Sequence, residues 1–146
     1  MGASPYWYFV PHEDPQVALN KLRQREFRAG RYNPAIRFLR FPITDESPAP
    51  GAKHKSIGAA MLDADADGTR SILDIDHICK TPEFLGACPV ADDVLTAFYG
   101  TTQPTRKQVE ANMEILDEIE RGHAVYVVLY EDGKPTELLF AGYSCD

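Results

Sequence analysis

The segment 123–143, HAVYVVLYEDGKPTELLFAGY, decides the fold class of this chain. Its two runs, 123–130 and 136–143, are rich in β-branched and aromatic residues, and the polar stretch EDGKP separates them. An Asp-Gly pair between two such runs is a strong signal for a β-hairpin, because these residues tolerate the positive φ angles of a tight turn. The C-terminal part therefore predicts two adjacent antiparallel strands.

Upstream of the hairpin, the sequence predicts one further strand and four helices. The stretch PYWYFV at 5–10 has the composition of a strand. The clearest helix covers 15–29, where Asp14 is the expected N-cap, Pro15 suits the first turn and Gly30 suits the end. Three other helices are expected, at 56–62 after Ser56, at 91–98, and at 105–121, which opens with a Thr105–Gln108 capping box.

Two segments carry a weaker pattern. In 33–43 the apolar residues slip out of phase, which indicates a strand with a bulge or an extended segment. In 71–78 apolar and acidic residues alternate, which favours a strand over a helix. Together the elements predict an α+β fold, in which a small mixed or antiparallel sheet packs against helices on one face.

The size and composition indicate one domain. The 146 residues, 44% of them hydrophobic, suffice for a single core over 1–146. The proline-rich loop 44–53 is the expected flexible place. No signal peptide and no run of ~20 apolar residues is visible, so no membrane association is expected. The three widely spaced cysteines fit free thiols in a reducing cytoplasm.

The charge is unevenly distributed along the chain. The net charge of −7 argues against non-specific binding of nucleic acid, which requires a basic surface. Residues 1–40 hold seven Lys or Arg and three Asp or Glu, a balance of +4, whereas residues 41–146 hold eight and nineteen, a balance of −11. Either the two parts face each other in the fold, or the basic part receives an anionic ligand.

Residues 62–74, LDADADGTRSILD, form a dense acidic run. Numbered from Asp63, carboxylates fall at the first, third and fifth positions, and Gly68 falls at the sixth, where a calcium loop turns sharply. Over twelve residues this run resembles the loop of EF-hand and dockerin-type calcium modules. The resemblance implies a Ca²⁺ (or Mg²⁺) site with ligands from Asp63, Asp65, Asp67, Thr69 and Asp74.

The acidic run also departs from that pattern. Arg70 stands where the family carries an apolar residue, and no second loop accompanies the first. One alternative is a solvated turn that Asp side chains close. The other is a Mg²⁺ site that also includes Asp76 and His77 and orients phosphate oxygens.

The helix expected at 15–29 has charges on its apolar face. Arg23 and Glu26 lie in the middle of the side that Leu19, Leu22 and Phe27 define. A charge buried alone costs several kcal/mol, so each needs a partner. The bland interpretation is an ion pair that fixes packing. The sharper interpretation is a polar pocket in which Arg23 and Glu26, with Arg31 and Tyr32, bind a carboxylate or phosphate.

The sequence carries few other signals of chemistry. His77, Cys79 and Cys88 lack the spacing of a zinc ribbon or finger. No P-loop, dinucleotide fingerprint, GxSxG or HExxH motif is present.

Three hypotheses for function follow. The first is a small soluble binding or regulatory protein that caps or inhibits a protein partner through an acidic surface, with 105–121 and 131–135 as candidate contacts. The second is an enzyme acting on a small anionic substrate, with an arginine-lined pocket and an Asp-bound metal. The third is a non-catalytic module that Ca²⁺ stabilises.

Overall fold

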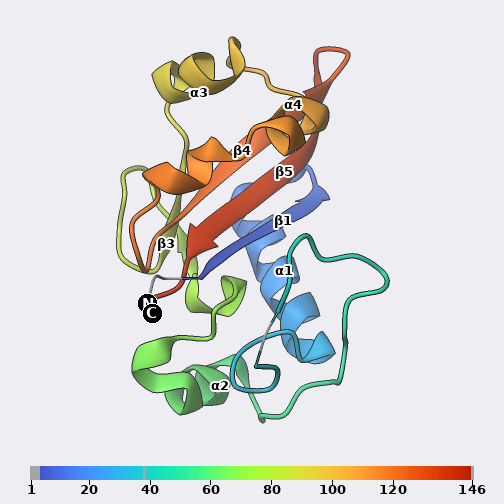
Figure 1. Ribbon diagram of the computed structural model, residues 1–146, viewed down its shortest axis with the longest axis vertical. Coiled ribbons are helices and arrows are strands. Elements are labelled where there is room, and N and C mark those ends of the chain that lie inside the picture. The colour runs from blue at the N-terminus through green and yellow to red at the C-terminus, as the bar shows by residue number, and fades with distance from the viewer. Residues whose placement is uncertain (1–3, 38, 146) are drawn as a thin grey trace.

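The computed structural model describes residues 4–37 and 39–145, and its strands form one mixed sheet (Figure 1). The strand order is β1-β5-β4-β3-β2. β1 (Pro5–Pro11), β5 (Lys134–Tyr143) and β4 (Ala124–Glu131) are antiparallel neighbours. β3 (Gly86–Pro89) and β2 (His77–Ile78) continue the sheet in parallel with β4. The predicted α+β class is confirmed.

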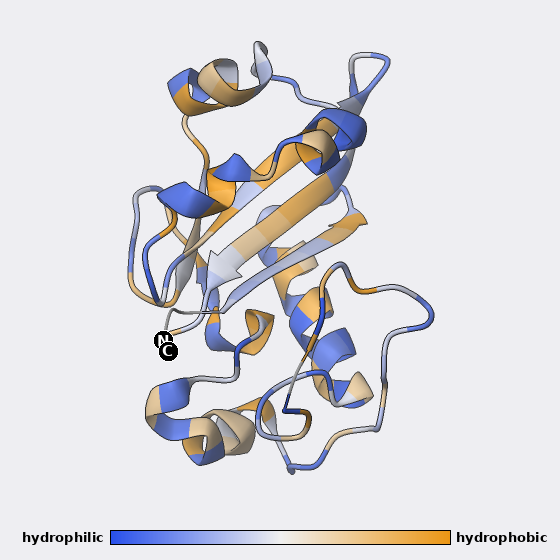
Figure 2. Ribbon diagram, viewed as in Figure 1, coloured by the Kyte–Doolittle hydropathy of each residue, from blue (hydrophilic) through white to orange (hydrophobic). Residues whose placement is uncertain are grey.

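The C-terminal hairpin has the predicted form. Glu131 pairs with Lys134, and the two residues between them have positive φ angles, 52° at Asp132 and 76° at Gly133. Positive φ at both central residues gives the turn the twist of the flanking strands. Most of β4 and the middle of β5 are coloured as hydrophobic in Figure 2.

Helices cover both faces of the sheet, whereas one covered face was expected. On one face, Tyr8 and Phe140 pack with Leu19 and Leu22 of α1 (Pro15–Ala29). This cluster is called the α1-side core. The opposite face forms the α4-side core, which combines strand residues such as Leu139 with residues of α3 (Asp92–Tyr99), α4 (Arg106–Ala111) and η3 (Glu114–Glu118). Figure 1 shows α1 and α4 on opposite sides of the sheet. The reason lies in β5, where four consecutive apolar residues, 138–141, are buried and therefore need cover on both faces.

Three predicted helices form with the expected caps. In α1 the Asp14 carboxylate accepts a hydrogen bond from the Val17 N–H at 3.2 Å, and Gly30 ends the helix with a φ of 74°. Ser56 caps α2 (Ile57–Ala64), which runs two residues beyond the predicted end. Gly100, with a φ of 72°, ends α3.

The helix predicted at 105–121 is wrong in its length. The capping box of Thr105 and Gln108 is present, but α4 ends at Ala111 and a short 3-10 helix, η3, follows. Asn112 breaks the helix because α3 holds it: its amide donates to the Phe98 carbonyl at 3.3 Å, and the Tyr99 hydroxyl donates to its carbonyl at 3.0 Å. The exposed stretch predicted as one acidic helix is therefore two shorter pieces.

The two segments with weaker patterns form little strand. Within 33–37 and 39–43 no strand is present, and Pro34 and Pro42, which lack an N–H, could not donate to a strand ladder. Of 71–78, only His77–Ile78 is strand, whereas Ile72–Asp74 forms a 3-10 turn, η2, that the Ser71 hydroxyl caps. For 33–43 the strand alternative is thus wrong among the described residues, and the strand predicted at 71–78 is confirmed only at His77–Ile78. No helix of the described residues is long and apolar enough to cross a membrane.

Candidate functional site

A fully buried carboxylate organises the most distinctive polar site of the molecule. Glu26 of α1 has no exposed surface. Arg31, just beyond the helix, donates to it with two parallel bonds, Nε to Oε1 at 2.9 Å and Nη2 to Oε2 at 2.6 Å. Arg25 adds a third bond, Nε to Oε2 at 2.9 Å. These bonds offset the free-energy cost of removing Glu26 from water, which would be several kcal/mol for an isolated buried carboxylate.

These arginines line a pocket of about 370 Å³ along the free edge of β1. Trp7, Tyr8 and Phe9 form its floor, and side chains of consecutive strand residues point to opposite faces. The pocket therefore reaches around the edge of the sheet rather than over one face. The other walls come from Arg106 of α4 and from the loop 42–49.

The edge of β1 offers backbone donors to this pocket. The Ser144 N–H donates to the Ser4 carbonyl, and the His12 N–H donates to the Thr136 carbonyl, both at 3.0 Å. In an antiparallel pair alternate residues exchange such bonds, so the even-numbered residues of β1 bond to β5. The N–H and C=O groups of Trp7 and Phe9 consequently point away from β5, toward the free edge.

Three arginines, Arg25, Arg31 and Arg106, and one carboxylate, Asp45, line the pocket. A guanidinium has five N–H donors, of which Glu26 takes two from Arg31 and one from Arg25. Within 4–37 and 39–145 no other partner is found for these two side chains, whose two positive charges face the single charge of Glu26. The hydrogen bond to Glu26 raises the pKa of Arg31, so Arg31 stays charged. Arg106 lies 4.2 Å above the Phe9 ring and bonds Glu137 at 2.9 Å.

The structure divides the four residues predicted to bind a ligand. Arg31 lines the pocket and Glu26 supports it from beneath. Arg23 lies elsewhere: its Nη2 donates to the Leu73 carbonyl at 2.7 Å, and burial lowers its pKa. Tyr32 is also buried away from the pocket, with its hydroxyl 2.8 Å from His54 Nδ1. Arg23 and Glu26 thus point to separate surroundings, although three residues separate them on the same helix.

Sequence reasoning missed Arg25, Arg106 and Trp7 as pocket residues. Arg25 carried a signal, because it adjoins the buried Glu26 in the sequence. Arg106 and Trp7 reach the pocket only through the packing of α4 and β1, which no local pattern reveals.

The acidic run forms a compact turn in which Asp63 and Asp74 have separate partners. Asp63 lies in α2 and accepts from His54 Nε2 at 2.8 Å. Asp65 and Asp67 are exposed in the 3-10 helix η1 (Asp65–Asp67). Asp74 is buried and accepts from the backbone N–H and hydroxyl of Thr69, at 3.0 and 2.8 Å.

These partners keep the acidic oxygens apart. Among the described residues, no three of Asp63, Asp65, Asp67 and Asp74 bring their ligand atoms within 4.8 Å of one another. The arrangement therefore resembles the plain turn more than a calcium loop, because α2 extends through the first position and Asp74 serves the turn itself. Calcium binding by this run stays a prediction without geometric support.

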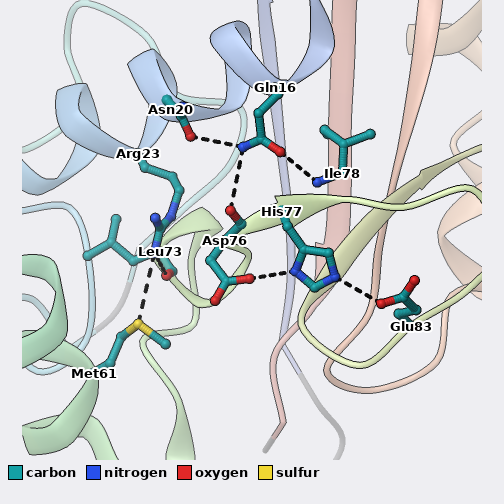
Figure 3. Close-up of polar contacts among 9 residues, drawn as sticks. All are labelled: Gln16, Asn20, Arg23, Met61, Leu73, Asp76, His77, Ile78 and Glu83. Carbon is teal, nitrogen blue, oxygen red and sulfur yellow. Dashed lines mark hydrogen bonds and ion pairs between the residues drawn. The ribbon is translucent and has the colours of Figure 1, made fainter.

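A second polar cluster surrounds His77 (Figure 3). The Asp76 carboxylate lies 2.6 Å from His77 Nδ1, and the Glu83 carboxylate lies 3.0 Å from Nε2. These two bonds, the one to Asp76 first, raise the pKa of His77. Gln16 of α1 accepts from the Ile78 N–H at 3.0 Å and so ties the cluster to the helix. Asp76 and His77, considered with the acidic run as Mg²⁺ ligands, thus bond to each other, and His77 also bonds Glu83.

No protein-family model, no curated protein and no solved structure matches the chain. Its function is therefore inferred from its own residues.

Proposed function

We propose that this protein binds an anionic group at the free edge of β1, with Arg25 and Arg31 as the residues that hold it. One observation carries the proposal. The fully buried Glu26 fixes the guanidinium groups of Arg25 and Arg31 beside an open pocket. Several N–H donors of these two groups do not bond Glu26 and can bind a ligand. A guanidinium held in this way recognises a carboxylate or a phosphate with its planar fork and loses little side-chain entropy on binding.

The ligand best suited to this pocket is an extended acidic segment of a partner protein. The outward N–H and C=O groups of Trp7 and Phe9 can pair with such a segment as an added strand. Its side chains would then point alternately toward Arg31 on one face and toward Arg106 on the other. This proposal keeps the expected role of a binding or regulatory protein that caps a partner, but it assigns the contact to a basic pocket.

Trp7 provides a direct test, because it is the sole tryptophan of the chain and lines the pocket. We expect its fluorescence to change on titration with an acidic peptide that has apolar residues at alternate positions. Arg25→Gln should weaken binding about tenfold or more, since a hydrogen bond to a charged group contributes about 1.5–3 kcal/mol. The variant should fold, because Glu26 keeps its two bonds to Arg31.

Arg28→Gln is the matched control. Arg28 is exposed on α1 and does not line the pocket. Its substitution removes the same charge as Arg25→Gln does. We expect it to weaken binding less than about twofold at physiological salt, because exposed charges are largely screened. Equal losses in Arg25→Gln and Arg28→Gln would mean that surface charge alone attracts the peptide, and the proposal would fail.

Two further titrants separate the alternatives. Tight binding of inorganic phosphate or a small dicarboxylate, with a weaker response to the peptide, would indicate a small anionic ligand or substrate. A lysine-rich peptide tests the acidic surface at Glu114, Asp117, Glu118 and Glu120, all of which are exposed. Binding of the lysine-rich peptide alone would overturn the pocket as the binding site and favour the acidic surface.

A further inference from the structure

The two short parallel strands at the end of the sheet gather three metal-binding side chains. In the β2–β3 pair His77 lies opposite Gly86, and the bond from the Cys79 N–H to the Ala87 carbonyl continues the pairing. Side chains alternate along a strand, so His77 and Cys79 lie on the same face. Glu83 comes from the connection between the strands and reaches His77 Nε2 at 3.0 Å.

The geometry points to a binding site for a divalent transition metal ion of the zinc class, with His77, Cys79 and Glu83 as its ligands. One nitrogen, one sulfur and one carboxylate oxygen from these residues lie within 4.8 Å of one another. Imidazole, thiolate and carboxylate are the ligands that Zn²⁺ takes in proteins, whereas Ca²⁺ and Mg²⁺ prefer oxygen alone. The site is distinct from the arginine-lined pocket, which shares none of these residues.

Gly86 keeps open the space between two of the donors. A Cβ atom at this position would lie 2.8 Å from Cys79 Sγ and 2.9 Å from His77 Nε2. Gly86 does not have the positive φ that calls for glycine, so the neighbouring side chains, rather than the backbone, exclude a larger residue. A zinc ion lies about 2.3 Å from its sulfur and about 2.0–2.1 Å from its nitrogen ligand. Side-chain movements of less than about 1 Å would therefore suffice to bind it.

The surroundings of His77 are those of a ligand held in position. Asp76 lies 2.6 Å from Nδ1 and fixes the ring so that Nε2 faces Glu83 (Figure 3). A carboxylate on the second nitrogen is the usual partner of a metal-binding histidine, because it orients the ring and raises its basicity. Gln16 holds this strand from α1 through the Ile78 N–H and the Asp76 carbonyl.

The site would leave a coordination position open. Cys79 is buried, whereas the His77 and Glu83 side chains are 40% and 54% exposed, so the cluster opens to solvent on one side. Within the described part of the chain no fourth His, Cys, Asp or Glu meets the same distance limit. Three protein ligands and one position for water are the pattern of reactive zinc sites, whereas purely structural zinc sites have four protein ligands.

Cobalt titration tests the site on the full chain, after reduction and removal of metals by a chelator. We expect one equivalent of Co²⁺ to produce a thiolate-to-cobalt charge-transfer band, and one equivalent of Zn²⁺ to abolish it. Cys79→Ser should remove the band. His77→Gln and Glu83→Gln should each weaken Zn²⁺ binding at least tenfold, and Asp76→Asn should weaken it about 10–100-fold through the orientation of His77.

Cys145→Ser is the matched control, because Cys145 is another free thiol and lies outside the cluster. It should bind Co²⁺ as the unmodified chain does. Gly86→Ala should also lose binding. If Gly86→Ala fails to fold, His77→Gln still tests the site, because His77 is partly exposed and its substitution should leave the fold intact. The proposal is overturned if the unmodified chain gives no band, if Cys79→Ser keeps the band, or if Cys145→Ser loses it.

Discussion

At the scale of single residues, the imidazole of His77 bonds two carboxylates, one from Asp76 and one from Glu83. The bond to Asp76, and after it the bond to Glu83, raises its pKa above the usual value of about 6.5. Because the folded pKa is the raised one, protonated His77 contributes stability below the unfolded pKa. That contribution is lost as the pH rises through the folded pKa. The contribution is small, because the His77 side chain is 40% exposed and solvent screens its charge.

This behaviour gives a prediction for the metal-free chain. An NMR titration of the His77 Cε1 proton, with a chelator present, should report a pKa above the usual histidine value. Asp76→Asn should lower that pKa, because it removes the carboxylate nearest to the ring. Asp117→Asn, which removes an exposed carboxylate of η3, should leave the His77 titration unchanged. An unchanged pKa in Asp76→Asn would contradict the assigned cause.

The residue scale also shows what could be predicted of the candidate site. Charges on the apolar side of α1 correctly indicated a buried ionic site, because a buried Glu26 must have a partner. Their partners were predicted only in part: Arg31 was expected near Glu26, whereas Arg23 turns away to the Leu73 carbonyl. The partners depend on the path of the chain after Gly30, and no local pattern encodes that path.

At the scale of elements, the break between α4 and η3 depends on α3. The backbone carbonyl of Asn112 accepts a hydrogen bond from the Tyr99 hydroxyl. Its side chain donates to the Phe98 carbonyl and accepts from the Glu114 N–H. Asn112→Ala should therefore destabilise the protein by about 1–2 kcal/mol in urea unfolding, since it removes the two hydrogen bonds of the Asn112 side chain. Lys107→Ala, at an exposed position of α4, should change stability by less than about 0.5 kcal/mol. A stabilised Asn112→Ala variant would mean that the helix prefers to continue.

Elements with local stop signals were predictable, and elements defined by their neighbours were not. Asp14 and Gly30 set the ends of α1, and the Asp132-Gly133 turn sets the hairpin, so their sequences suffice. The helix at 105–121 lacks an internal stop signal, and only contact with α3 interrupts it. β3 went unrecognised because a strand of four residues that other elements cover has no distinctive periodicity.

At the scale of the whole molecule, β5 joins the two cores into one unit. Its neighbouring residues Leu139 and Phe140 are both fully buried, Leu139 in the α4-side core and Phe140 in the α1-side core. β4 is divided in the same way, with Ala124 on the α1 side and Val127 on the α4 side. Neither core can lose its packing without exposing strands that the other core needs.

Unfolding should therefore be one cooperative transition in which both faces melt together. We expect Leu139→Ala to cost about 2–5 kcal/mol and Phe140→Ala about 3–5 kcal/mol. Trp7 fluorescence follows the α4-side core, against which Trp7 packs, and far-ultraviolet circular dichroism follows the helices, the longest of which is α1. In each variant the two signals should give the same reduced denaturation midpoint. If Leu139→Ala lowered the fluorescence midpoint while the dichroism midpoint stayed unchanged, the two faces would be separate units, and β5 would not couple them.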